Sequence, residues 1–183
     1  PARLAWFLFE VPNLLWVAAT VWKHYLGSQQ EQSSSTTLTT MTGGEDSSLV
    51  GNYILLGFFT LHYLRRTIWY PWRMMSLQAK PVPLGIILSA MSYTSVNGYL
   101  QCQSLLAFHR FPLPSYGSTT AYHLVTFGGG LVMALAGMII NAQTDAALCR
   151  LRSLGKGYQI PRGYWLFDYV SCPHYLGEIL EWL

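Results

Sequence analysis

Long uncharged segments alternate with short polar segments along this chain. Three segments contain no Asp, Glu, Lys or Arg: residues 47–64, 83–108 and 121–144. Each approaches or exceeds the roughly 18–20 residues that an α-helix needs to cross a bilayer. A fourth apolar segment, residues 4–26, is interrupted only by Glu10 and Lys23. The pattern predicts an all-α fold, a polytopic transmembrane helical bundle.

The boundaries of the predicted spans follow from prolines and polar segments. We expect four full spans and the start of a fifth, at residues 6–26, 49–70, 83–108, 121–151 and 173–183. Proline is tolerated near a helix start, as at Pro12, whereas Pro71 is expected to end the second span. Residues 27–48 are rich in Ser, Thr, Gln and Gly, so we expect a disordered linker there, within a single domain that covers residues 1–183.

Basic residues mark two of the loops. Four lie at or after the end of the second span and four at or after the end of the fourth span, namely Arg65, Arg66, Arg73 and Lys80, then Arg150, Arg152, Lys156 and Arg162. The 27–48 linker contains neither Lys nor Arg. Because basic loops stay in the cytosol, we expect the ends of spans two and four there and the linker on the lumenal side.

The composition agrees with a membrane protein. Half of the residues (51%) are hydrophobic and only 10% are charged, whereas about a quarter of a soluble domain is charged. The three cysteines lack metal-ligand spacing, so we expect free thiols, no metal site and no nucleic-acid partner. No Rossmann fingerprint or P-loop occurs. The chain opens without Met and stops inside its last helix, so we expect a piece of a longer membrane protein.

Polar residues converge near the cytosolic ends of the first two spans. Glu10 lies in the first span, and His62, Tyr63 and Arg66 lie at the end of the second. A buried, protonated Glu10 can donate a hydrogen bond to a ketone oxygen, with Trp6 on the same face walling an apolar pocket. The alternative is a first-turn Glu favoured by the helix dipole. Tyr63 is either an interface aromatic or a phenol that polarises a carbonyl.

A second polar group lies at the cytosolic end of the fourth span. Four positions share one helix face there: Asn141, Asp145, Leu148 and Arg152. Polar groups at bilayer depth are costly and usually functional, so this stripe indicates a site for a polar ligand. Helix-end polar groups, and a capping pair for His174 and Glu178, are the structural alternatives. The glycines at 128–130 predict a close helix-packing site.

The chain resembles the steroid 5α-reductase family. Matching blocks follow one another with agreeing order and spacing, apart from the linker and the segment before Lys80: AWFLFEVPNL, LHYLRRTIWYP, KPVPL, NGYLQ, GMIINAQTDAALCRLR, GYQIPRG and LFDYVSCPHYLGEILEW. The last two blocks are the most specific. The resemblance implies a seven-span enzyme of the endoplasmic reticulum membrane with a cytosol-facing active site. This chain would hold spans two to five and the start of span six.

The resemblance also implies a reaction and its residues. The family is an NADPH-dependent oxidoreductase that reduces the Δ4 double bond of 3-oxo-steroids by hydride transfer to C5. Its catalytic Glu and Tyr match Glu10 and Tyr63, which would hold the 3-keto oxygen, and a Trp of the steroid pocket matches Trp6. Its cofactor contacts match Tyr70, Lys80, Asn141, Asp145, Arg152, Tyr158, His174 and Glu178.

Three positions depart from the family pattern. His174 stands where the family has Asn, Gln159 stands where it has a basic residue, and the family's Asn after Tyr70 has no counterpart at residues 73–75. These departures concern contacts to NADPH rather than the class of reaction. The expected partners are a steroid or related lipid and the membrane lipid. The alternatives are a very-long-chain enoyl reductase, a polyprenol reductase, or a non-catalytic sterol-binding protein.

Overall fold

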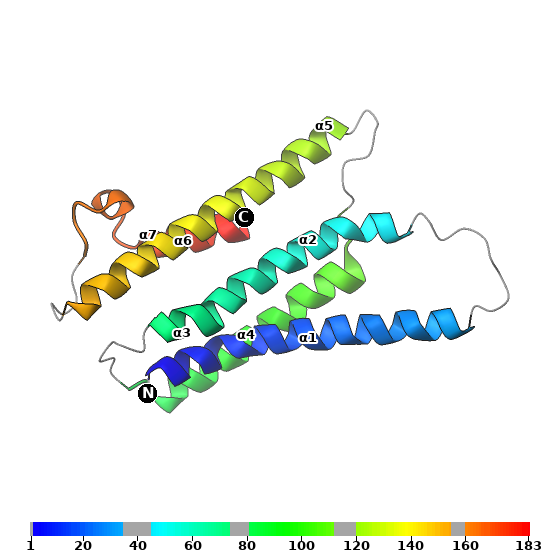
Figure 1. The fold of residues 1–183 in the computed structure, drawn as a ribbon, viewed down its shortest axis with the longest axis horizontal. Coiled ribbons are helices and arrows are strands. Elements are labelled where there is room, and N and C mark those ends of the chain that lie inside the picture. Colours follow the sequence, from blue (N-terminus) through cyan, green and yellow to red (C-terminus); the bar gives the residue numbers. More distant parts are fainter. Residues whose placement is uncertain (1, 35–44, 74–80, 112–119, 155–159) are drawn as a thin grey trace. The chain divides into compact units, whose positions relative to one another are not determined.

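The computed structural model describes residues 2–34, 45–73, 81–111, 120–154 and 160–183, and every regular element in these ranges is a helix (Figure 1). This confirms the all-α prediction for the described residues. The chain forms two compact units. The first comprises Pro1–Trp72 and Ala79–Leu113, and the second comprises Arg73–Gln78 and Pro114–Leu183.

Three long helices build the first unit. Its elements in chain order are α1 (Ala2–Ser34), α2 (Glu45–Leu64), the π-helical turn η1 (Arg65–Trp69), α3 (Tyr70–Arg73), α4 (Leu84–Gln103) and a second π-helical turn, η3 (Ser104–Phe108). Pro83 precedes α4 with an extended backbone (φ −57°, ψ 141°). The fixed φ of proline suits that position, and its missing N–H costs nothing there.

An apolar cluster joins the helices of the first unit. Its buried members come from α2, α4 and η3: Leu56, Cys102, Leu105 and Leu106. Trp16 and Val17 of α1 pack against this cluster, as does Leu55. Van der Waals contacts among these side chains join the three helices.

Asn52 of α2 fixes the far end of α4. Its side chain is fully buried, and Nδ2 donates to the carbonyl oxygens of Leu105 (2.5 Å) and His109 (2.8 Å). Its Oδ1 accepts a hydrogen bond from the Phe111 N–H at 2.8 Å. Carbonyls at a helix end lack intrahelical donors, so this single amide satisfies groups that would otherwise be buried without partners. A Cβ at Gly51 would collide with the Phe111 carbonyl, so glycine permits the close approach.

The second unit consists of one long helical segment and a short helix packed on it. Its elements in chain order are α5 (Thr120–His123), the π-helical turn η4 (Leu124–Gly128), α6 (Gly129–Ser153), the 3₁₀-helix η5 (Trp165–Asp168) and α7 (Pro173–Trp182). In Figure 1, α7 lies alongside α6. Pro173 is the first residue of α7, as the sequence predicts, because the first helical position needs no N–H donor.

Glycines allow α6 and α7 to touch. A Cβ on Gly137 would lie 2.5 Å from the Gly177 carbonyl oxygen, and a Cβ on Gly177 would lie 2.7 Å from the Gly137 carbonyl oxygen. No atom of the described residues, the helix's own backbone aside, lies within 4 Å of a Cβ placed at any of the glycines at 128–130, so their role as a packing site stays a prediction. Contact depends on which side of the helix faces a neighbour, and a run of glycines does not specify that side.

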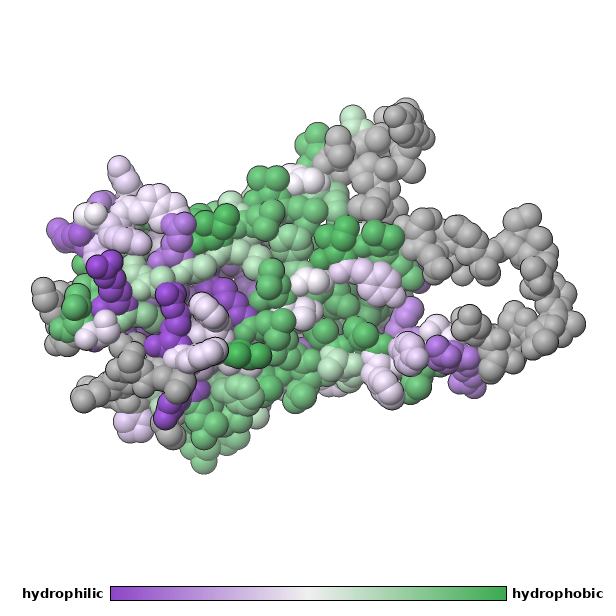
Figure 2. All heavy atoms as spheres, viewed as in Figure 1, coloured by the Kyte–Doolittle hydropathy of each residue, from purple (hydrophilic) through white to green (hydrophobic). Residues whose placement is uncertain are grey.

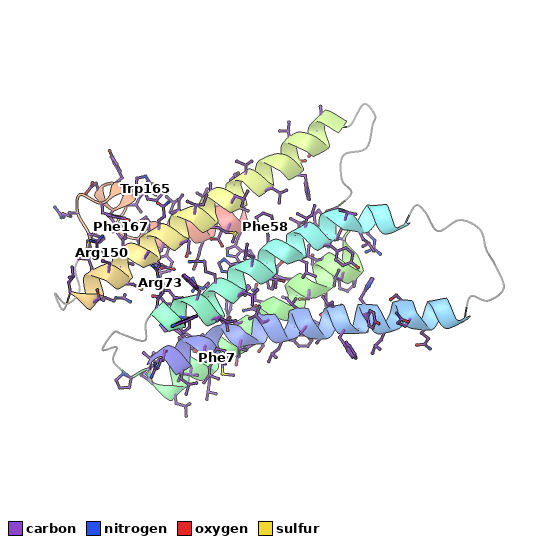
Figure 3. All side chains as sticks on the ribbon, viewed as in Figure 1. Phe7, Phe58, Arg73, Arg150, Trp165 and Phe167 are labelled. Carbon is purple, nitrogen blue, oxygen red and sulfur yellow. The ribbon has the colours of Figure 1, made fainter. Side chains whose placement is uncertain are left out.

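A tight turn leads into η5. Gly163 has φ +76°, a conformation that glycine adopts without strain, and its N–H donates to Asp168 Oδ1 at 2.6 Å. Figure 3 labels Trp165 and Phe167 on this element. Phe167 is buried (5% exposed), whereas Trp165 is 47% exposed. One aromatic side chain of η5 therefore anchors the segment that precedes α7.

Two helical stretches in the described ranges are long and apolar enough to cross a membrane, Ala2–Gln30 and Val125–Ser153. Only 28% and 11% of their apolar windows are buried, so most of this surface faces outward, and Figure 2 shows hydrophobic side chains across the visible face. Soluble proteins rarely expose so much contiguous apolar surface, which together with the two helices supports a membrane protein. The spans expected at 49–70 and 83–108 are helical, but that they cross a membrane stays a prediction.

The helices extend further than the sequence indicates. α1 continues to Ser34 and α2 begins at Glu45, so helix occupies both ends of the predicted 27–48 linker, and only its centre lies outside the described residues. A helix that has nucleated gains a hydrogen bond with each added residue, and Gln and Glu are good helix formers. Composition alone therefore placed the end of α1 too early and the start of α2 too late.

Two prolines also lie elsewhere in their helices than expected. Pro12 is in the interior of α1 because this helix begins at Ala2. Pro71 does not end the second span, since it is buried in α3, which follows the wider η1 turn. A proline removes one N–H donor and crowds the preceding turn, and a π-helical turn is a common way to relieve a helix locally.

Candidate functional site

Glu10 and Arg66 form an ion pair between α1 and η1. Arg66 Nε donates to Glu10 Oε1 at 2.9 Å, and the side chains are 20% and 8% exposed, respectively. The Arg66 guanidinium also lies over the Trp6 indole, with Cζ 5.7 Å from the ring centroid. Tyr70 meets the same indole in a T-shaped contact at 5.2 Å. The structure therefore brings three predicted site residues, Trp6, Glu10 and Tyr70, together around Arg66.

This pairing differs from the expectation for Glu10. A guanidinium only donates hydrogen bonds, so Glu10 Oε1 accepts here, and a carboxylate is the form that such a charged donor stabilises. A carboxylate cannot donate to a ketone. The helix-dipole alternative does not fit either, because α1 begins at Ala2 and Glu10 lies beyond its first turn. The catalytic role of Glu10 stays a prediction.

Tyr63 of α2 is buried, with 7% of its surface exposed. Its hydroxyl oxygen accepts a hydrogen bond from Asn97 Nδ2 of α4 at 3.0 Å, and the same amide nitrogen donates to Asn13 Oδ1 of α1 at 3.3 Å. The phenol ring contacts Phe59 and His62 at centroid distances of 4.7 and 4.9 Å. A ring enclosed in this way does not fit the alternative of an aromatic side chain that faces the membrane interface.

We call the hydrogen-bonded set of Asn13, Asn97 and Tyr63 the amide–phenol rung. Glu10 and Asn13 are three residues apart on α1, and Tyr63 and Arg66 are three residues apart in sequence on the helix that crosses it. Residues at this spacing share a helix face. The Glu10–Arg66 pair and the amide–phenol rung therefore lie about one helical turn apart, along one line of contact between helices of the first unit.

Asn13 and Asn97 were not among the predicted site residues. The sequence held one signal: Asn97 is the only Asn in the uncharged 83–108 segment, where a polar side chain is costly unless it has a partner. Charged neighbours on the same helix face drew attention to Asn141, and Asn97 has none. Asn97 also precedes Gly98, and a Cβ at that glycine would lie 2.9 Å from the Asn13 Cα. The pair of residues therefore marks a close approach of α4 to α1.

In the second unit, Asn141 is fully buried where α7 crosses α6. Its Nδ2 donates to the His174 carbonyl oxygen at 3.2 Å and to Glu178 Oε1 at 3.4 Å. Gly177 allows this approach, because a Cβ there would lie 2.8 Å from the Asn141 backbone nitrogen. Three of the predicted cofactor residues, Asn141, His174 and Glu178, are thus brought together by one helix crossing.

The other predicted cofactor residues are less enclosed or lie elsewhere. On α6, Asp145 is half-buried and Arg152 is exposed. Tyr70 belongs to the first unit, where it packs on Trp6. The predictions for Lys80 and Tyr158 fall outside the described residues. His174 Nδ1 is buried and has no hydrogen-bond partner among the described residues, which is the kind of group that a bound ligand can satisfy.

The two groups of side chains suit different chemistry. The first unit offers a buried phenol and an ion pair beside aromatic rings, an arrangement that suits a carbonyl of an otherwise apolar molecule. The second unit offers an amide, two carboxylates and an exposed guanidinium, which match the hydroxyl and phosphate groups of a nucleotide. None of these observations depends on how the two units are placed relative to each other.

Comparison with known proteins assigns the family. The family model described as 3-oxo-5-alpha-steroid 4-dehydrogenase matches residues 80–183. Steroid 5-alpha-reductase DET2 of Solanum lycopersicum is 40% identical over 132 residues, which are 72% of this chain and 49% of that protein. The proteins named 3-oxo-5-alpha-steroid 4-dehydrogenase 1 of Mus musculus and Homo sapiens are 34% and 35% identical over 183 residues.

These alignments to the mouse and human proteins cover all of this chain, and 61% and 60% of those relatives. The chain therefore spans about half to three fifths of the length of the curated relatives it matches. The family model covers more than half of the chain, and the resemblance inferred from the sequence blocks is confirmed. The chain belongs to the 3-oxo-5-alpha-steroid 4-dehydrogenase family.

Proposed function

We propose that the protein containing this chain reduces the Δ4 double bond of 3-oxo-steroids with NADPH. Family membership and the printed names of the relatives support a steroid substrate. The observation that carries the proposal is the buried Tyr63 hydroxyl, which Asn97 holds between helices at 3.0 Å. A fixed phenol among aromatic rings suits recognition of one oxygen on a large apolar molecule.

Tyr63 donates a hydrogen bond to the 3-keto oxygen of the steroid. Negative charge develops on this oxygen as the double bond is reduced, so a donor already in place stabilises the transition state more than the ground state. Loss of one such donor costs about 10²–10³ in turnover in enzymes that stabilise an oxyanion. Trp6 lines the apolar wall of the substrate site.

Glu10 acts at the same oxygen. Paired with Arg66 it accepts a hydrogen bond and cannot donate one. We propose that Glu10 releases Arg66 on substrate binding, takes up one proton from water and meets the ketone as a protonated carboxyl. Apolar surroundings favour the neutral form of a carboxyl group, and the steroid would supply them. The Arg66 guanidinium would then remain over Trp6, where the ring face attracts it.

NADPH, when bound, would supply the hydride that adds to C5 of the enone, and a proton added at C4, the α-carbon, would complete the reduction. The residues that would hold it on α6 and α7 are Asn141, Asp145, Arg152, His174 and Glu178, and the family resemblance adds Tyr70, Lys80 and Tyr158. The residues fit such a group, because His174 Nδ1 is a buried polar atom without a partner among the described residues. Arg152, exposed at the end of α6, would bind a phosphate oxygen.

We propose that the protein resides in the endoplasmic reticulum membrane with its active site facing the cytosol. Support comes from the apolar Ala2–Gln30 and Val125–Ser153 helices and from the basic residues after the second and fourth predicted spans. In sealed microsomes, a cysteine introduced at Ser34 should react with an impermeant thiol reagent only after permeabilisation. The parent protein, which carries the three native cysteines, is the control. Labelling of the Ser34→Cys variant in intact microsomes above the level of the parent would contradict the proposed topology.

Substrate competition tests the proposed reaction. Microsomes that contain the full-length protein should consume a 3-oxo-Δ4-steroid with NADPH, and should turn over enoyl-CoA and polyprenal substrates much more slowly. Preference for enoyl-CoA or polyprenal would assign the protein to one of the rival lipid reductases. Steroid binding without NADPH-dependent turnover would show a non-catalytic sterol-binding protein.

A further inference from the structure

The Asn97 side chain connects three helices through the two hydrogens of one amide nitrogen. One contact runs to the Tyr63 hydroxyl at 3.0 Å and the other to Asn13 Oδ1 at 3.3 Å. An amide NH₂ group has two hydrogens, so both are used. Asn97 itself is half-buried, whereas Asn13 is fully buried. The amide therefore has a defined orientation, set by an acceptor on α1.

This orientation has a consequence for the phenol. A hydroxyl group has one hydrogen and two lone pairs. When the Tyr63 oxygen accepts the Asn97 hydrogen, the O–H bond of Tyr63 points away from Asn97. The amide thus selects the direction in which the phenol donates. A carboxylate at position 97 would do the reverse, because it accepts hydrogen bonds and would capture the phenolic hydrogen.

The register of α4 against α1 holds the amide in place. One turn before Asn97, Thr94 Oγ1 donates to the Phe9 carbonyl oxygen at 2.6 Å. This carbonyl lies next to the turn that Pro12 disturbs, where a proline crowds the preceding carbonyl groups and leaves them open to other donors. One residue after Asn97, Gly98 packs on Asn13, since a Cβ there would lie 3.0 Å from Asn13 Oδ1.

We propose that Asn97 is a positioning residue that orients the Tyr63 hydroxyl for donation to the substrate carbonyl, with Asn13 fixing the Asn97 amide. The inference rests on the proposed function, because it takes Tyr63 as the donor to the ketone. Asn97 acts through Tyr63 and need not touch the steroid. Its loss should therefore lower kcat and leave KM for the steroid within about twofold.

A double-mutant cycle in the full-length protein tests this role. The variants are Asn97→Ala, Asn97→Asp and Tyr63→Phe, with each Asn97 change also made in the Tyr63→Phe background. In the parent background, kcat should fall about ten- to a hundredfold for Asn97→Ala, by analogy with residues that orient the side chains bound to a metal ion. Asn97→Asp should fall further, because the carboxylate redirects the phenol. In the Tyr63→Phe background, neither change should lower kcat by more than about twofold.

Asn52→Asp is the matched control for the same amide-to-carboxylate change. Asn52 is also fully buried, and it lies at the far end of α2, where it binds the end of α4. This variant should lower thermal stability while the rate per folded molecule stays within about twofold of the parent. If Asn97→Asp fails to fold, Asn97→Ala in the two backgrounds carries the test alone.

Two results would overturn the inference while the proposed function stands. Equal fold-losses from Asn97→Ala in the parent and Tyr63→Phe backgrounds would show a purely structural role. Parent-like activity of Asn97→Asp would show that the phenol donates to position 97. Failure of the proposed role of Tyr63 would give a different result, namely full turnover of the single Tyr63→Phe variant. That result would show that the phenol takes no part in the reaction, and Asn97 would then have no positioning role.

Discussion

Both units of this protein bury an asparagine at a glycine crossing, but the two amides have different partners. In the first unit, Asn13 packs on Gly98 and is linked to Tyr63 through Asn97. In the second unit, Asn141 packs on Gly177 and contacts the candidate ligand residue Glu178 directly. The same packing device therefore supports a phenol in one unit and a ligand-binding carboxylate in the other.

Solvent exposure adds to this difference, whereas hydrogen-bond length does not. Asn97 Nδ2 lies 3.0 and 3.3 Å from its two acceptors, and Asn141 Nδ2 lies 3.2 and 3.4 Å from its own. Tyr63 is buried, while Arg152 of the second unit is exposed. A preorganised donor suits a reacting group, and adaptable contacts suit a cofactor that enters and leaves. Changes in the first unit should therefore alter turnover, and changes in the second should alter affinity.

The largest expected effect is on turnover in the first unit. Tyr63→Phe removes one oxygen at nearly constant volume, so the fold should persist while kcat for a 3-oxo-Δ4-steroid falls on the order of a hundredfold or more, as for loss of an oxyanion donor. NADPH affinity should stay within about twofold. A Tyr63→Phe variant that loses NADPH affinity and keeps its turnover rate would contradict the assignment of turnover to the first unit and of cofactor affinity to the second.

A stability measurement tests the glycine crossing of the second unit. Gly177→Val should lower the free energy of unfolding by about 1–3 kcal/mol or more, the cost of overpacking, because its Cβ would lie 2.7 Å from the Gly137 carbonyl oxygen. Gly130→Val is the matched control, since no atom of the described residues lies within 4 Å of a Cβ there. Thermal unfolding of the solubilised full-length protein would report both, and equal melting temperatures would refute the close crossing.

The sequence was sufficient to predict the helices and insufficient to predict their contacts. Long apolar segments, three of them uncharged, identified every long helix of the described residues, because backbone polar groups that leave water must be paired within the helix. Helix ends were less predictable: Ser34 ends α1 later than composition indicates, and Pro71 lies within a helix. These ends depend on cooperative propagation and on π-helical turns, which single residues do not encode.

The candidate site was predicted as a set of residues and not as an arrangement. The resemblance named Glu10 and Tyr63, but the Arg66 ion pair depends on how α1 is rotated against α2, and sequence spacing within one helix does not give that rotation. Asn97 was missed because, unlike Asn141, it has no charged residue on its helix face. The glycine that matters for helix packing, Gly177, is isolated in sequence and becomes recognisable only when its neighbour on α6 is known.

A smaller effect is expected on cofactor affinity in the second unit. Asp145→Ala and Arg152→Ala should each weaken NADPH binding about tenfold or more, the value of a hydrogen bond to a charged group, with the Kd for steroid nearly unchanged. Titration of the full-length protein with NADPH and with steroid would compare the two affinities. Unchanged cofactor affinity in both variants would remove the polar stripe of α6 from the cofactor site.

The smallest effect is expected for Glu10→Gln. Glu10 is neither a preorganised donor nor a cofactor contact in the structure, because it is the ion-pair partner of Arg66 there and a proposed donor in the reaction. Glutamine can accept a hydrogen bond from Arg66 and can also donate one to a ketone. Exchange of a charge-assisted for a neutral hydrogen bond costs roughly 1 kcal/mol, so kcat/KM should fall only about fivefold.

Glu10→Ala is the comparison variant, because it removes both the donor and the acceptor. It should lower kcat/KM well beyond the loss seen for Glu10→Gln, with NADPH affinity retained in both. If glutamine and alanine are equally inactive while both variants still bind NADPH, hydrogen bonding by Glu10 is not its contribution. Only a group that gains and loses a proton would then explain the loss, and Glu10 would act in proton transfer rather than as the second donor to the ketone.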